Sequence, residues 1–203
     1  MMIRHILPIA AILTAAAVLP QKAGAQAAQF LDYNPDARTA GMAGAGASLQ
    51  ASAFSMWNNT AAAALSGQTM DVAASYGLWQ PSSAGNNVIS AAGYGRVAEF
   101  MTLSAGIKYF SYKPYDITDS GSLITGSYTP KEMSAGVGLA FRILPILSVG
   151  ANVNYVFSDI GGVKKAHAVS ADFGAMLDLK FMRIGATVSN IGSKINYGGT
   201  SSY

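Results

Sequence analysis

The chain of 203 residues is apolar and poor in charge, since 51% of its residues are hydrophobic, 11% are charged and 22 are glycine. Charged residues make up about a quarter of a typical soluble domain, so this composition favours a membrane protein. The one long apolar run lies at the N-terminus, which excludes a bundle of transmembrane helices, because each span needs about 20 apolar residues.

Residues 1–25 are predicted to be a secretory signal peptide. A short basic start precedes an apolar stretch over 6–19, and Ala23-Gly24-Ala25 fits an A-x-A cleavage site. Removing this segment lowers the basic count from 13 to 11 (13 − 2) against 10 acidic residues, a net charge of +1. Such a balance argues for no nucleic-acid partner.

Residues 26–67 are predicted to form a periplasmic or plug-like segment before the strands. Gly41, Gly44 and Gly46 superficially resemble a dinucleotide loop, but the required strand, helix and acidic partner are not evident. We expect these glycines to permit close backbone packing inside a barrel. Asp36 and Arg38 are candidates to anchor the segment to lumen residues through charged hydrogen bonds, and a solvated lead-in is the alternative.

Residues 68–203 are predicted to be strands, because seven stretches alternate between apolar and polar or small residues. In the clearest, Met133, Val137 and Phe141 share one face while Ser134 and Arg142 share the other. The seven stretches are 69–79, 88–96, 100–110, 131–142, 147–158, 166–179 and 183–191.

Two all-β architectures fit this pattern, a soluble sandwich and a transmembrane antiparallel β-barrel. The connections alternate in length: 97–99, 143–146 and 180–182 are short, whereas 80–87, 111–130 and 159–165 are longer. Short periplasmic turns and longer outer loops are typical of outer-membrane barrels, so we favour the barrel and the outer membrane as its location. The aromatic residues expected at its interfaces are Trp79, Tyr109, Tyr112, Phe141, Phe157 and Phe181.

An odd strand number raises a difficulty, because bacterial single-chain barrels have even numbers and an open edge in lipid leaves backbone groups unpaired. Either the chain is roughly half of a larger barrel, or the count is wrong by one. On the polar face, structural pairing is expected rather than a substrate path. The residues of this lumen network are Asp71, Lys108, Arg142, Asp172, Asp178 and Arg183.

Both ends of the mature chain resemble the PorV/PorQ family of outer-membrane proteins, relatives of FadL-type barrels associated with type IX secretion. The resembling residues are the stretch from Asn34 to Arg38, the glycine run from Gly41 to Ala47, the pair Trp57-Asn58, and residues 189–197. Family members have about fourteen strands, with the last of these segments near the middle. The resemblance therefore implies the N-terminal half of a FadL-like barrel, with Trp57 and Asn58 in the plug-like segment.

The resemblance implies a non-enzymatic component of type IX secretion that needs no cofactor and binds exported cargo or the translocon. Loops 111–130 and 159–165 are the expected contact sites, because loops on a rigid scaffold carry recognition. The alternatives are a FadL-like channel for hydrophobic small molecules and a lipopolysaccharide deacylase. A deacylase of the Ser-His-Asp type would have to use His167, the one histidine outside the signal peptide. Residues 116–122 carry oxygen ligands but lack the EF-hand spacing, so we expect a loop there.

Overall fold

The structure is a computed structural model that describes residues 29–79, 85–160, 165–179, 181–193, 195–196 and 201–202. The predicted signal peptide over 1–25 lies outside these residues. Within the described part, no helix combines the length and the apolar character needed to cross a membrane.

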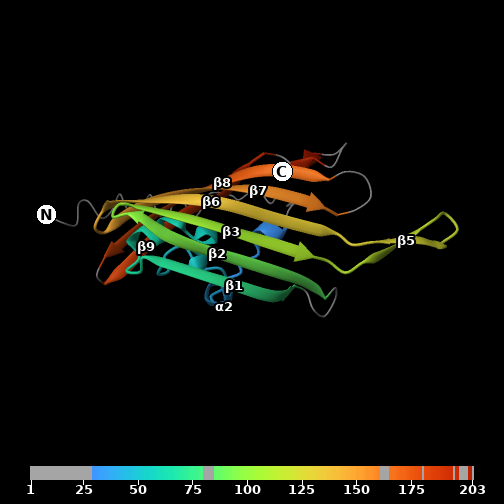
Figure 1. Cartoon of the computed structure of the whole chain (residues 1–203), viewed down its shortest axis with the longest axis horizontal. Coiled ribbons are helices and arrows are strands. Elements are labelled where there is room, and N and C mark those ends of the chain that lie inside the picture. The colour runs from blue at the N-terminus through green and yellow to red at the C-terminus, as the bar shows by residue number, and fades with distance from the viewer. Residues whose placement is uncertain are drawn as a thin grey trace, which may run out of the picture.

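Seven strands form one antiparallel sheet in which each strand pairs with the next one along the chain, apart from a hairpin between the third and fourth (Figure 1). All seven predicted strands are confirmed, with bounds shifted by a few residues. They are β1 (Met70–Trp79), β2 (Asn86–Ala98), β3 (Met101–Ser111), β6 (Lys131–Leu144), β7 (Leu147–Asp159), β8 (Ala166–Leu179) and β9 (Met182–Gly192). Two further short strands, β10 (Ile195–Asn196) and β11 (Ser201–Ser202), pair with each other.

The connections divide the sheet into two ends. We call the end with connections 99–100, 145–146 and 180–181 the turn end, and the end with 80–85, 112–130 and 160–165 the loop end. The alternation of short and long connections is thus confirmed. The expectation of a plain loop over 111–130 is wrong, because β4 (Tyr115–Thr118) and β5 (Ile124–Tyr128) form a hairpin there that extends well beyond the sheet (Figure 1).

The sheet is open in the described residues, with β1 and β9 as its edges, and it is not closed into a barrel. Its two faces differ in polarity. On the outer face, apolar side chains are exposed, for example Val72 at 69% and Val137 at 64%. On the inner face, Ser134, Ser148 and Asn152 are buried. This polarity is the reverse of that of a soluble sandwich, whose apolar faces pack together.

Residues 29–67 lie against the inner face, where Figure 1 shows them in blue to cyan beneath the strands. The segment is built of single turns of helix: η1 (Gln29–Asp32), α2 (Ala37–Gly41), η2 (Ala53–Trp57) and η3 (Thr60–Leu65). Side chains hold these short turns in place, because isolated helices of this length are unstable. Asp36 caps α2, Asn59 caps η3, and Ser52 and Ser55 form a capping box at η2.

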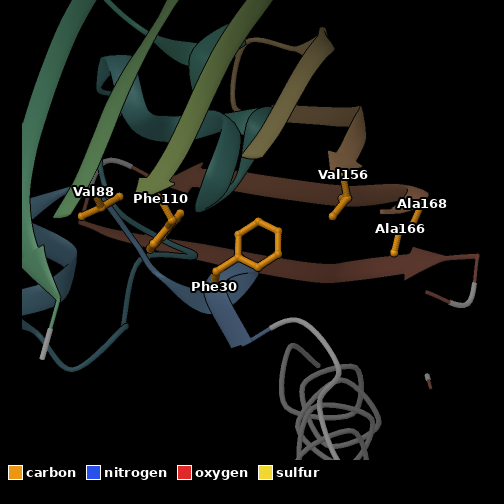
Figure 2. Close-up of a cluster of buried hydrophobic side chains, with 6 residues drawn as sticks. All are labelled: Phe30, Val88, Phe110, Val156, Ala166 and Ala168. Atoms are coloured by element: carbon orange, nitrogen blue, oxygen red, sulfur yellow. The ribbon is translucent and has the colours of Figure 1, made fainter. Parts of the chain in front are cut away.

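An apolar cluster fills the interior at the loop end. Phe30 packs there on Phe110 of β3 with their ring centroids 5.5 Å apart, beside Val88, Val156, Ala166 and Ala168 (Figure 2). The segment therefore spans the inner face, from Phe30 at the loop end to η3, which packs on Met176 near the turn end.

The interfacial aromatics are placed in part as expected. Tyr109, Phe141 and Phe157 lie on outer-face positions of the register, and Phe181 is exposed at the turn end. Tyr112 is a correction, because it faces the interior and donates a hydrogen bond to buried Glu132. Tyr112 continues the alternation of β3, in which Lys108 and Phe110 also face inward. The side chain of Trp79 lies outside the described atoms.

Candidate functional site

The centre of the plug-like segment is a polar cluster around Asn58. Its amide donates to Asp36 Oδ2 at 3.3 Å and to Thr39 Oγ1 at 3.1 Å, and its oxygen accepts from Asn34. Thr39 also donates to Asp36 at 2.9 Å and is fully buried. Asp36 and Asn58, two residues predicted for the plug, thus hold the fold of the segment itself.

The three plug glycines have different roles. A Cβ on Gly46 would meet Asn58 Oδ1 at 2.6 Å and Thr39 Cγ2 at 2.8 Å, so the segment packs closely on itself at this glycine. Gly44 adopts a φ of +85°, which favours glycine, but has open space around it. For Gly41 the packing prediction is wrong, because nothing lies within 4 Å of an added Cβ.

The predicted anchoring of the segment by Asp36 and Arg38 is also wrong. The carboxylate of Asp36 is used within the segment, by the α2 cap, Thr39 and Asn58. Arg38 is exposed and forms no ion pair with any described residue. Asp36 is the N-cap of α2, which uses its carboxylate locally, and Arg38 is the second residue of α2 and lies on its solvent side.

Side chains of the sheet instead bind the main chain of the segment. Lys108 of β3, 2% exposed, donates from Nζ to Leu31 O at 2.9 Å and to Tyr33 O at 3.1 Å. Asp71 of β1 accepts from the N–H of Ala53 at 2.9 Å. These two predicted lumen residues therefore anchor the plug-like segment, because each forms hydrogen bonds with its backbone groups.

Further anchors of the same kind are uncharged side chains. Ser148 donates to Ala61 O at 2.7 Å, and Asn152 donates to Met56 O at 3.1 Å. Asn59 of the segment donates to Ala175 O of β8 at 3.0 Å. The sequence does show serine and asparagine on the face of small residues. It does not reveal that these side chains bind main-chain groups more than 80 residues away.

Glycines of the sheet allow the segment to approach the strands closely, because a side chain at these positions would collide with it. A Cβ on Gly150 would meet Ala61 N at 2.6 Å, and one on Gly106 would meet Met56 Sδ at 2.6 Å and the ring of Trp57 at 2.9 Å. Trp57 itself stacks on Phe54, with Lys108 Nζ 5.4 Å from a ring centroid, so it packs between the segment and the sheet. Gly174 meets Asn59 and Gly185 meets Ala47 in the same way. The segment thus touches all seven strands of the main sheet.

The remaining predicted lumen residues do not join one network. Asp172 accepts from Asn154 at 2.9 Å and from the Asn190 N–H at 2.6 Å, which links β7, β8 and β9. Asp178 and Arg183 form a local ion pair of 2.9 Å at the turn end. Arg142 donates to the carbonyl of Glu99, across the turn end. Each of these groups is satisfied close to its own strand end or edge.

A polar cavity of about 270 Å³ remains between the segment and β8–β9. Lys108, Asp172, Asn58, Asn154 and Trp57 are among its lining residues. This interior cavity is polar, whereas a channel for hydrophobic molecules needs an apolar pocket.

His167 is the second residue of β8 rather than the end of a loop. It faces outward, where its Nδ1 lies 2.5 Å from the hydroxyl of Tyr155 and its ring lies 5.3 Å from that of Phe157. These partners are a phenol and an aromatic ring, whereas a hydrolase of the Ser-His-Asp type needs a serine and a carboxylate.

The β4–β5 hairpin is attached at its base to the end of β7. Tyr128 donates to Asp159, and Tyr115 donates to the carbonyl of Ile160 at 3.3 Å. The hydrogen bond to Asp159 raises the pKa of Tyr128 to about 12. Beyond this base the hairpin exposes apolar side chains, with Leu123 69% and Ile124 63% exposed. Its turn is ordered by Asp119, which accepts from Gly121 N and Leu123 N.

Comparison with known proteins supplies the family. No curated protein sequence matches the chain. The family model described as type IX secretion system protein PorV matches residues 18–202, nearly the whole length. The chain therefore belongs to the PorV family of type IX secretion system proteins.

Proposed function

We propose that this chain forms part of the wall of an outer-membrane β-barrel, filled on its inner side by residues 29–67, and acts as a non-enzymatic component of type IX secretion. The observation that carries the proposal is the reversed polarity of the sheet in a member of a secretion family. In water, the exposed outer face would be an aggregation hazard, whereas in lipid it is the stable arrangement.

The height of the apolar band supports a bilayer. On β3, outer-face residues run from Tyr109 near the loop end to Met101 at the turn end. This run covers nine residues, which matches the about 9–11 residues that a tilted strand needs to cross the hydrocarbon core of a bilayer. The loop end would then face outward and the turn end the periplasm.

The β4–β5 hairpin is the proposed recognition element for exported cargo or the translocon. It projects from the loop end, and it keeps apolar side chains exposed on a base fixed by Tyr128 and Asp159. Exposed apolar groups on an anchored support favour protein binding. Its two strands pair only with each other among the described residues, which leaves a backbone edge on either side for an added strand.

The test is a double substitution in the full-length gene, Leu123→Ser with Ile124→Ser. We expect loss of cargo secretion and of co-purification with the secretion machinery, while outer-membrane assembly is unchanged. The matched control is Ser120→Thr with Ser122→Asn, which keeps the polar turn and its apolar neighbours. Normal secretion by the double serine variant would contradict the assignment of the hairpin.

A further inference from the structure

The outer face carries a shallow groove of about 660 Å³ that crosses the sheet from β1 to β8. Small residues, Ala91, Ala105 and Ala135, leave its floor low, and larger side chains such as Ile107 and Val153 border it. The single polar side-chain atom among its lining residues is the hydroxyl of Tyr155, at the end near β8. The groove is therefore apolar along its length and polar at one end.

That end is extended by a row of polar groups toward the loop end. The Tyr155 hydroxyl is hydrogen-bonded to His167, which is exposed. Two residues further along the strands lie Lys131 and Lys165, both exposed, with Asp159 between them. Lys165 is 3.9 Å from Asp159, whose carboxylate also accepts from Tyr128, so the row keeps an excess of positive charge.

We propose that the groove and this polar row bind one phosphate-bearing lipid, with an acyl chain along the alanine floor and the phosphate at Lys131, Lys165 and the Tyr155–His167 pair. The site depends on the membrane location given under Proposed function, but not on the role in secretion. Charge complementarity selects the occupant, because an apolar protein surface would leave the lysines unused while a phosphate pairs with them.

The direction of the groove fits this occupant. Strands of transmembrane barrels are tilted by about 45°, so a groove that crosses them runs obliquely through the bilayer. A lipid whose headgroup lies at the loop-end interface would direct its chain along that path. Tyr155 lies where the groove meets the interface, the position at which tyrosine, with an apolar body and a polar tip, is favoured.

The experiment uses the full-length gene product, reconstituted into phosphatidylcholine vesicles that contain a minor fraction of dioleoylphosphatidic acid. Flotation with the vesicles reports membrane insertion, and native mass spectrometry after extraction in mild detergent counts the lipids retained. We expect the wild type to retain one phosphatidic acid per chain. Ala135→Phe fills the groove floor, and Lys131→Gln with His167→Gln removes one lysine and the histidine of the polar end; each should lower retention about tenfold, a factor equal to about 1.4 kcal/mol.

Ala151→Phe is the matched control, since Ala151 lies on the outer face of β7 but outside the groove, and it should retain lipid as the wild type does. Equal loss in Ala151→Phe and Ala135→Phe, or equal retention of phosphatidylcholine and phosphatidic acid, would overturn the lipid site. A protein that co-purifies with the wild type and is lost in Ala135→Phe would replace the lipid as occupant and also overturn it. A protein that floats without retained lipid disproves this site alone, whereas one that does not float disproves the proposed membrane location as well.

Discussion

The inner and outer faces of the sheet are formed by the same strands but carry opposite kinds of side chain: the inner face buries polar residues, and the outer face exposes apolar ones. Inside, Ser134, Asn152 and Lys108 are at most 2% exposed, and the last two donate to main-chain groups of the plug-like segment. Outside, Val137 and Phe173 are 64% and 53% exposed. The comparison shows that specific packing is confined to the inner face, while the outer face leaves its apolar side chains exposed, as the proposed membrane location requires.

The largest expected effect comes from overfilling the inner face. Gly150→Leu places a side chain where Ala61 N already lies 2.6 Å from the added Cβ, and a main-chain atom cannot move aside cheaply. Overpacking costs about 1–3 kcal/mol or more, so we expect η3 to leave its seat and the folded, heat-modifiable species to be lost. The control is Ala151→Leu on the outer face, and wild-type unfolding of Gly150→Leu would show that the segment does not rest there.

A charge on the outer face should have the next largest effect, provided that lipid surrounds it. Val137→Lys would cost about 2–4 kcal/mol near the middle of a bilayer but within about 0.5 kcal/mol at a water-exposed surface. We expect reduced outer-membrane assembly, measured as the folded fraction in isolated membranes. Unchanged assembly, with better solubility of the chain, would mean that water covers this face.

Removing the buried cation should release the segment without unfolding the sheet. Lys108→Met removes the hydrogen bonds that the ammonium group donates to the carbonyls of Leu31 and Tyr33, and losing a hydrogen bond from a charged group costs about 1.5–3 kcal/mol. We expect faster proteolysis within residues 29–35. Mass spectrometry of the fragments measures the rate of cleavage there. Lys165→Met, at an exposed ion pair, should change little. Equal rates of proteolysis in the two variants would show that Lys108 does not anchor the segment.

The smallest effect concerns the hairpin base. The hydrogen bond from Tyr128 to Asp159 stabilises the protonated phenol and raises its pKa to about 12, from an ordinary value near 10. Its contribution is therefore present below pH 10 and disappears as the pH rises through about 12. The difference between the ultraviolet titrations of wild type and Tyr128→Phe should show one phenolate forming near pH 12. If that difference instead showed the phenolate of Tyr128 forming near pH 10, the hydrogen bond to Asp159 would not hold the hairpin.

The seven strands could be predicted because period-two alternation is local and survives whichever medium covers the apolar face. The hairpin over 115–128 could not, since strands of four and five residues alternate too briefly to be distinguished from a loop. Polar residues such as Asp71 and Lys108 could be placed on the inner face, but not their partners. Those partners are backbone groups of the segment, and main-chain acceptors leave no trace in the amino-acid pattern.

The contacts between the segment and the sheet also set the order of folding. Ser148 bonds to a carbonyl 87 residues earlier, and Asn59 bonds to one 116 residues later. Contacts so distant in sequence form slowly, because long loops must close first. Residues 29–67 are therefore expected to become fixed in the same late step as β7 and β8, rather than as soon as they are synthesised. A substitution in residues 29–67 is accordingly expected to slow assembly of the whole sheet, as a folding defect that appears far from the altered residue.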